Sequence, residues 1–345
     1  MRKSMLTKSA AAAFLALALT ACGEKEGRSL PSEEVTEAVE TETETETETE
    51  TEPEEETLSP EDMDLVKYNY YVDLNNDIFE VIDSIGYYFE VVGREEEFSL
   101  LPDTGLTYGY RVYGKNTDIV DDCLMLADME PAYEELDPLV KEIADPLRDI
   151  MTTFSDVSDS YDYADNQYQK AKEYHAVIYA SADKVTDLGY KFMDAIAQMG
   201  AERTAQEEQK FLDEGRLIIY NASHALTIAR QVLDVIDAQE ITDENITELD
   251  LTEIRPLYDE LLKVVADFDA ATSDNDQLMK ESISNSRPFD GLYDGLAQAL
   301  EWMMKQVDSG RPLDLSGSGA PLGSIGHFSE CMGKCIDRYN SVFVE

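Results

Sequence analysis

The chain has 345 residues and a formal net charge of −47 at pH 7, because 74 acidic residues outnumber 27 basic ones. This excess argues against nucleic acid as a partner, since phosphates require a basic binding surface. It also argues against a domain that lies flat on anionic lipid. The segment from position 60 to position 345 is long enough to bury a large core.

Residues 1–21 have the features of an export signal. Basic residues near the start precede an apolar run of mostly Ala and Leu over residues 9–20, which is too short to span a bilayer. The residues at and just after the end of this run, Leu19-Thr20-Ala21-Cys22, resemble the lipobox of bacterial lipoproteins. The resemblance implies that Cys22 carries a diacylglyceryl group and becomes the acylated N-terminus after cleavage. The alternative is an ordinary signal peptide with a chance cysteine.

The lipobox therefore predicts where the protein resides. We expect an extracytoplasmic protein that contacts a bacterial membrane through the lipid on Cys22, because two or more acyl chains give stable anchoring. Beyond this covalent lipid the sequence indicates no cofactor.

Residues 22–59 are predicted to be a disordered tether that follows the lipidated cysteine. They contain the run TETETETETETEPEEE and almost no apolar side chains. A segment of low hydrophobicity and high charge cannot bury enough surface to offset its chain entropy. Like charges extend it further, so at about 3.3 Å per residue it could reach roughly 120 Å. We expect a spacer between the membrane and the folded part.

Helical periodicity begins at position 60. Ser59-Pro60-Glu61-Asp62 is typical of a helix N-terminus, with a capping serine and proline at the first helical position. The helix is expected to run to about Gly93, and residues 97–115 are predicted to form a loop with a short hairpin. Helices resume near Thr117 and are expected to break around the prolines at positions 131, 138 and 146.

The middle of the chain shows the clearest pattern. Apolar residues alternate at spacings of three and four from Tyr168 to Met199, and a second such series runs from Phe211 to Ile236. Between them, Gly200 suits a helix C-terminus and residues 204–207 match a capping box. The pattern predicts two long antiparallel helices joined by a short turn, and a single kinked helix is the alternative. His175 lies on the first series, where a histidine is most often a core residue.

Three further helices are predicted near residues 250–273, 286–308 and 322–344. No fixed repeat indicates a solenoid, and no alternation of strands and helices indicates a parallel sheet. The predicted fold is therefore all-α: an elongated helical bundle with a long antiparallel helical hairpin, in a single helical domain over residues 60–345 that follows the disordered acidic tether.

The spacing of His327, Cys331 and Cys335 could place all three side chains on one broad helix face. Three interpretations remain open. The cysteines could be buried thiols. Cys123 could form a disulfide with Cys331 or Cys335, as is common in exported proteins. Least favoured, His327, Cys331 and Cys335 could bind a soft metal, with Cys123 as a fourth ligand.

No motif for catalysis is recognisable. The sequence lacks GxSxG, a Walker A loop, a GxGxxG that opens a helix, and HExxH. His224 has no Cys, Asp or Glu three or four positions away, and we assign it no role. Paired carboxylates carry no information in so acidic a chain. We therefore predict that the protein is not an enzyme.

The segment LVKYNYYVDLNND, Leu65 to Asp77, resembles the opening of the YiiG-like lipoprotein family, a domain of unknown function. Ser160 to Ile178 resembles the middle of that family, and Tyr339-Asn340 resembles a Tyr-Asn near its end. The resemblance covers nearly all of residues 60–345 and implies an exported lipoprotein of unknown activity. An asparagine on a helical stripe, such as Asn75, is expected to be a buried amide with a partner on a neighbouring helix.

These features favour a membrane-anchored exported lipoprotein that displays a helical binding or interaction domain, with an unknown protein, cell wall or small molecule as partner. The alternative is a lipoprotein that captures a solute or a metal; a cavity between helices lined by tyrosine would favour it. A cell-wall-active enzyme is the third and least favoured possibility.

Overall fold

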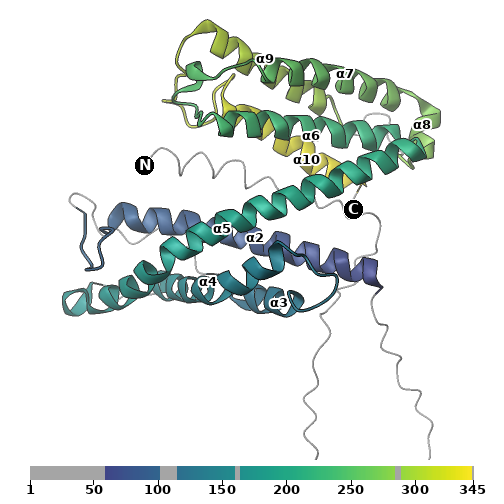
Figure 1. Cartoon of the computed structure of the whole chain (residues 1–345). Coiled ribbons are helices and arrows are strands. Elements are labelled where there is room, and N and C mark those ends of the chain that lie inside the picture. The colour runs from purple at the N-terminus through teal and green to yellow at the C-terminus, as the bar shows by residue number, and fades with distance from the viewer. Residues whose placement is uncertain (1–58, 102–114, 160–163, 284–288, 344–345) are drawn as a thin grey trace, which may run out of the picture.

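A computed structural model describes residues 59–101, 115–159, 164–283 and 289–343. These residues form an all-α structure, as predicted, with one isolated bridge between Val92 and Leu100. The predicted signal and nearly all of the tether lie outside the described residues. The longer helices, shown in Figure 1, are α2 (Pro60–Val91), α3 (Asp118–Leu126), α4 (Leu136–Asp159), α5 (Asp165–Glu214), α6 (Leu217–Ala238), α7 (Ile254–Ser273), α9 (Leu292–Ser309) and α10 (Ile325–Phe343).

Two hydrophobic cores divide the described helices. The first core takes buried side chains from Tyr68 to Ile196, on α2, α3, α4 and the first part of α5. The second core takes buried side chains from Phe211 to Tyr339, on the end of α5 and on α6, α7, α9 and α10, with the short helix α8 (Asn275–Lys280) at its edge. The segment predicted as one domain thus contains two cores, a division that the periodicity did not predict.

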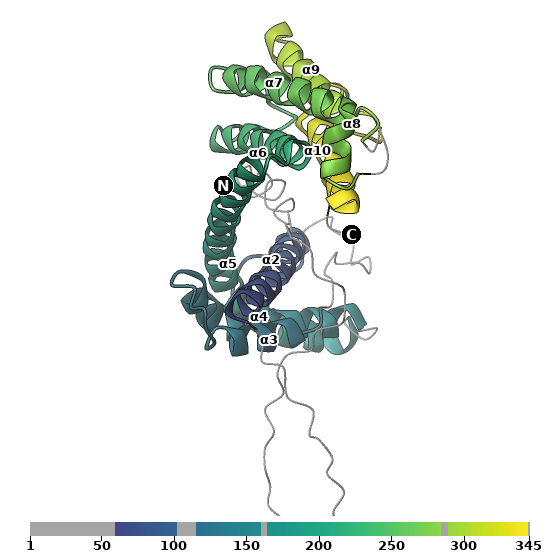
Figure 2. The ribbon, with the colours of Figure 1, turned by 90° about the vertical axis from the view of Figure 1, so that its right-hand side faces the viewer.

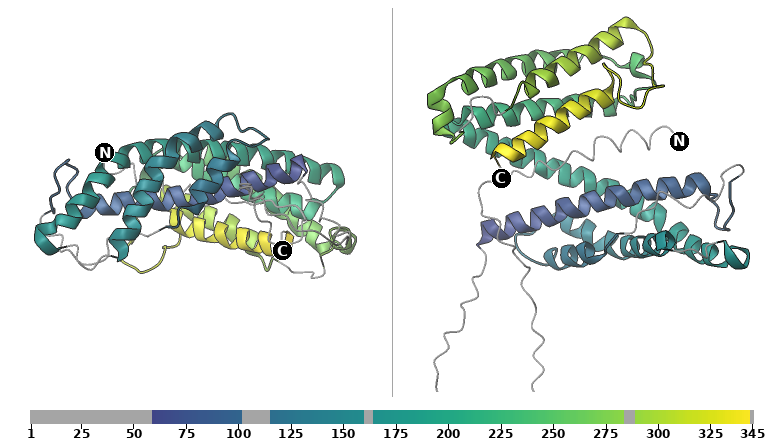
Figure 3. Two further views of the ribbon diagram at one scale, coloured as in Figure 1. Left: turned by 90° about the horizontal axis from the view of Figure 1, so that it is seen from below. Right: turned by 180° about the vertical axis from the view of Figure 1, so that it is seen from behind.

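Helix α5 is the element that the two cores share. It runs diagonally from the lower bundle in Figure 1 to the upper one, and Figure 2 shows the two bundles at its two ends. The view from behind in Figure 3 shows α2 and α10 on the facing sides of the two bundles. Helix α5 has 50 residues, and the backbone of Asn166, Gln167 and Tyr168 near its start is left-handed. The regular part that follows, to Glu214, spans roughly 70 Å at about 1.5 Å per residue.

The turn between the two predicted long helices lies later than the sequence indicated. Helix α5 continues through Gly200 and the expected capping box at residues 204–207. It ends instead at Gly215, whose φ of 65° and ψ of 33° form a left-handed C-cap. The prediction of a turn at Gly200 was therefore wrong. Gly200 is buried against Tyr68, and a Cβ atom at this position would lie 2.9 Å from the Tyr68 hydroxyl, so the glycine makes room for a tertiary contact and does not end the helix.

The first helix begins as predicted. The side chain of Ser59 accepts a hydrogen bond from the backbone N–H of Asp62, and Pro60 opens α2. Two of the three expected helix breaks at proline are absent. Pro131 lies between α3 and α4, but Pro138 lies in the first turn of α4 and Pro146 lies inside α4 without ending it. A proline in a first turn removes no helical hydrogen bond.

The backbones of α2 and α5 approach closely at Gly189. A Cβ atom placed on Gly189 would lie 2.8 Å from side-chain atoms of both Ile78 and Ile82. Glycine is favoured here because any side chain would force Ile78 and Ile82 to shift. This contact fixes how α5 crosses α2, and so positions the site described below.

Candidate functional site at the junction of helices α2 and α5

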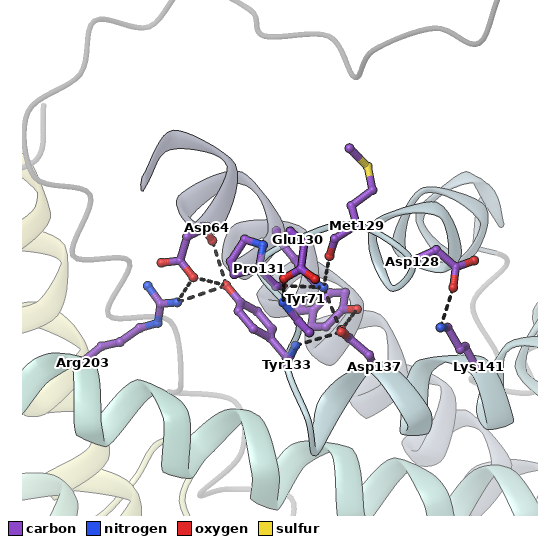
Figure 4. A network of polar contacts seen from close by, with 12 residues as sticks. Asp64, Tyr71, Asp128, Met129, Glu130, Pro131, Tyr133, Asp137, Lys141 and Arg203 are labelled. Atoms are coloured by element: carbon purple, nitrogen blue, oxygen red, sulfur yellow. Dashed lines mark hydrogen bonds and ion pairs between the residues drawn. The ribbon is translucent and has the colours of Figure 1, made fainter. Parts of the chain in front are cut away.

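A buried cation lies at the centre of the polar network in the first core. The Lys67 side chain is fully buried, and its Nζ donates to the backbone carbonyls of Met129 and Pro131 and to a carboxylate oxygen of Asp137, each at 2.9 Å. Asp137 also accepts from the hydroxyl of Tyr71 at 2.6 Å and from the backbone N–H of Tyr133 at 2.8 Å. Figure 4 shows how these groups converge. A buried charge is tolerated only when it is paired and hydrogen-bonded in this way.

The network continues toward α5 through Tyr133. The Tyr133 hydroxyl donates to Asp64 at 2.8 Å and accepts from Nη2 of Arg203 at 3.0 Å, and Arg203 donates to Asp64 at 2.7 Å (Figure 4). Burial acts to raise the pKa of Asp64, but the hydrogen bonds from Arg203 and Tyr133 outweigh it and hold that pKa below its usual value. Arg203 also lies over the ring of Tyr68, with 4.5 Å from Cζ to the centroid. Its guanidinium is therefore held in one orientation.

A cleft of about 280 Å³ opens beside Arg203. Leu65, Tyr68 and Asn69 of α2 form one wall. The opposite wall comes from α5, where Gly200, Arg203, Thr204, Gln206, Glu207 and Lys210 line the cleft. Its volume is near the lower end for small-molecule pockets. We call it the junction cleft.

Glu207 is the unusual group of the junction cleft. Burial raises the pKa of its carboxyl to about 7, and the nearby charges of Lys210 and Arg203 oppose that shift. Among the residues that the structure describes, the side chains of Glu207 and Asn69 have no hydrogen-bond or ion-pair partner. The charges of the neighbouring network are paired within it, so the cleft is where polar groups remain available for a ligand.

The histidines occupy two kinds of environment. His175 lies in the first core as predicted, is 1% exposed, and contacts the Tyr88 hydroxyl at 2.9 Å and the Glu95 carbonyl at 2.8 Å. His224, to which we assigned no role, contacts the buried carboxylate of Glu208 at 2.9 Å and the exposed carboxylate of Glu260 at 3.5 Å. The hydrogen bond with Glu208 raises the pKa of His224, with burial opposing.

Helical spacing could not have revealed the partners of His224. Glu208 lies on α5 and Glu260 on α7, whereas His224 is on α6. Glu208 also accepts from the hydroxyls of Ser223 and Thr227, at 3.0 Å and 2.8 Å. This cluster ties three helices of the second core together and is fully occupied with internal contacts.

The predicted cysteine sites are not brought together. Cys123 is buried in the first core, whereas Cys331 and Cys335 lie in the second, and all three are free thiols in this structure. The disulfide between Cys123 and either of the others is thus not formed here. Cys123 donates instead to the backbone carbonyl of Tyr70, and Cys335 to that of Leu292, each at 3.4 Å. Both environments fit buried thiols.

His327 and Cys331 are near neighbours, with 3.9 Å between Nε2 and Sγ. Across the described ranges no group of three or more His, Cys, Asp or Glu side chains is arranged to hold a metal ion.

No described helix is long and apolar enough to cross a membrane.

Asn75 is buried, as expected, but its amide has no partner in the described part of the chain, so the predicted hydrogen bond to a neighbouring helix is absent. A larger hollow of about 510 Å³ lies beside Phe268, Phe289 and Tyr293. We assign this hollow no role.

Comparison with known proteins places the chain in a family. A family model described as "Protein of unknown function (DUF3829)" matches residues 62–341, which covers both cores and the junction cleft. The chain belongs to this family. No curated protein and no solved structure matches it. As a DUF3829 protein it therefore inherits no activity, and its function must be argued from its own residues.

Residues of the junction cleft were only partly foreseeable. The motif that carried the family resemblance includes Lys67, Tyr68, Asn69 and Tyr71. The structure places Lys67 and Tyr71 in the buried network, and it places Tyr68 and Asn69 at the cleft. The sequence analysis did not identify Arg203 and Glu207 as cleft residues, because it predicted a turn between two helices in their segment. Their spacing of four positions was the available signal.

Proposed function

We propose that this DUF3829 protein is an exported, YiiG-like lipoprotein, anchored through Cys22 and its acidic tether, that captures a small polar ligand. The observation that carries the binding role is the junction cleft, where Tyr68 and unpaired polar groups of two crossing helices converge. A cavity between helices lined by tyrosine favours solute capture over a purely protein-binding surface.

The position of the cleft supports this proposal. Leu65 and Tyr68 lie within the first three turns of α2, directly after the end of the tether at residue 59. Arg203 is held in place by the paired network behind it. A site supported by a rigid second layer binds with less loss of side-chain entropy.

The anchor is tested by intact-mass spectrometry of the protein extracted from its native membrane. We expect a chain that begins at Cys22 and carries acyl groups. A chain that keeps residues 1–21, or one cut elsewhere without lipid, would contradict the anchor.

The binding role is tested by native mass spectrometry after incubation with a small-molecule extract of the source cells. Gln206→Trp places a large side chain at the exposed rim of the cleft, and Gln209→Trp is the matched control on the same helix outside it. We expect bound small molecules in the unmodified chain and in Gln209→Trp, but not in Gln206→Trp. Equal binding by all three chains would place the ligand elsewhere.

A further inference from the structure

We propose that the junction cleft recognises its ligand through a carboxylate group. This inference rests on the proposed binding function and names the chemistry of the ligand. The argument begins from charge. The chain carries a net charge of −47, yet Arg203 and Lys210 both line this cleft, with Glu207 as the single acidic group there. Arg203 is already ion-paired with Asp64, whereas Lys210 has no ion-pair partner among the described residues. The cleft therefore offers an anion the charge of Lys210 and the remaining N–H groups of Arg203.

Arg203 is built to receive a planar anion. Its contacts to Asp64 and to Tyr133 both use Nη2, and its Nη1 and Nε have no partner among the described residues. The guanidinium packs over the ring of Tyr68 and is paired with the carboxylate of Asp64, and these two contacts fix its plane. A guanidinium with free N–H groups in a fixed plane suits a carboxylate, which accepts two parallel hydrogen bonds.

Glu207 supplies a second contact that depends on protonation. When neutral, its carboxyl can donate a hydrogen bond to a bound carboxylate; when ionised, it repels one. Four titratable or charged groups face Glu207: Arg203 and Lys210 on α5, Tyr68 on α2 and Tyr339 on α10. The charge of Arg230 on α6 acts on Tyr68, where it opposes the rise in pKa that burial causes. Since the pKa of Glu207 is raised to about 7 by burial, carboxylate binding takes up a proton near neutral pH.

The same residues disfavour other ligand classes. A cationic amine would face Arg203 and Lys210, and like charges in a partly buried site are costly. A neutral molecule would leave the free N–H groups of Arg203 unpaired where water is partly excluded. A volume of about 280 Å³ restricts the ligand to a small molecule or the end of a longer one.

The inference is tested by calorimetric titration of the full chain with two matched pairs of probes. N-acetylglycine is compared with N-acetylglycinamide, and glucuronate with glucose. At pH 6 we expect at least one acid to bind about tenfold tighter than its neutral partner, as a charge-assisted contact requires. Tighter binding of N-acetylglycine indicates a peptide-type carboxylate, and tighter binding of glucuronate a sugar acid. Neutral probes that bind as well as both acids would overturn the inference while leaving a ligand-binding cleft in place.

Three variants separate the contacts. Lys210→Gln should weaken acid binding about tenfold, whereas Lys305→Gln, an exposed lysine on α9, should leave it unchanged. From pH 6 to pH 8 acid binding should weaken about tenfold, following the protonated fraction of Glu207, and Glu207→Gln should abolish this dependence. If Lys210→Gln has no effect, or if the pH dependence survives in Glu207→Gln, the inference fails. If no probe binds at either pH, the inference fails as well, and the mass-spectrometric test above decides the proposed function separately.

Discussion

The ammonium group of Lys67 lies 2.9 Å from the carboxylate of Asp137, and the Lys67 side chain has no exposed surface. The pair joins α2 to the start of α4 across 70 positions of sequence. Removing one member leaves the other charged and buried without its counter-charge, which costs more than the pair itself stabilises.

We therefore predict that Lys67→Met destabilises the protein by about 3–5 kcal/mol. Urea unfolding followed by circular dichroism measures this change. The double variant Lys67→Met, Asp137→Leu removes both charges and should recover part of the loss. A double variant less stable than Lys67→Met would show that Asp137 stabilises the core through Tyr71 and Tyr133 rather than through Lys67.

The cluster around His224 predicts a pH-dependent contribution to stability. The folded pKa of His224 is raised, chiefly by Glu208. The contribution is therefore complete below the unfolded value near pH 6.5 and is lost as the pH rises through the higher folded value. The difference in melting temperature between the unmodified chain and His224→Gln should be larger at pH 5.5 than at pH 8.5.

Glu260→Gln is the control for this cluster. Its carboxylate lies 3.5 Å from the ring of His224, against 2.9 Å for Glu208, so it should reduce the pH dependence only slightly. A melting-temperature difference for His224→Gln that does not change with pH would contradict the assignment.

Two glycines in helices should respond oppositely to alanine. A Cβ atom on Gly86 would contact nothing within 4 Å, so Gly86→Ala should stabilise α2 by up to about 1 kcal/mol through helix propensity. A Cβ atom on Gly189 would lie 2.8 Å from Ile78 and Ile82, so Gly189→Ala should destabilise the protein by about 1–2 kcal/mol. Thermal unfolding of both variants tests the close approach of α2 and α5, and equal stabilisation would show that α5 can shift.

The three described cysteines should differ in reactivity. Cys331 is partly exposed, whereas Cys123 and Cys335 are buried and have no exposed surface. Burial raises the pKa of all three thiols, that of Cys335 to about 12. Under native conditions N-ethylmaleimide should label Cys123 and Cys335 on the order of 100-fold more slowly than Cys331. If peptide mapping without reduction finds Cys123 cross-linked to either of the others, this arrangement of the cores is wrong.

Local signals in the sequence were read correctly where they concern a single helix. Ser59 and Pro60 define the start of α2, because capping depends only on neighbouring backbone groups. His175 was expected in the core because it lies on the apolar stripe, and the structure places it there.

Signals that depend on a second helix were misread or missed. Gly200 resembled a helix end, but it lies against Tyr68 of α2. Glu208 and His224 form a contact across two helices that no spacing within one helix predicts. The two cores were missed for the same reason, since periodicity shows that a helix has an apolar face but not which helices that face contacts.

The continuity of α5 also limits how this chain can change in length. Between Glu207 and Phe211 the helix leaves the junction cleft and enters the second core. One residue inserted there would turn everything beyond it by about 100° and displace it by about 1.5 Å. The second bundle would then face a different direction, and an insertion after Glu208 would also separate its carboxylate from His224 and Ser223 of α6. Insertions and deletions are therefore restricted here as strictly as in a coiled coil, whereas a substitution at Gln209, which is exposed and lies outside the cleft, leaves both cores and the cleft unchanged.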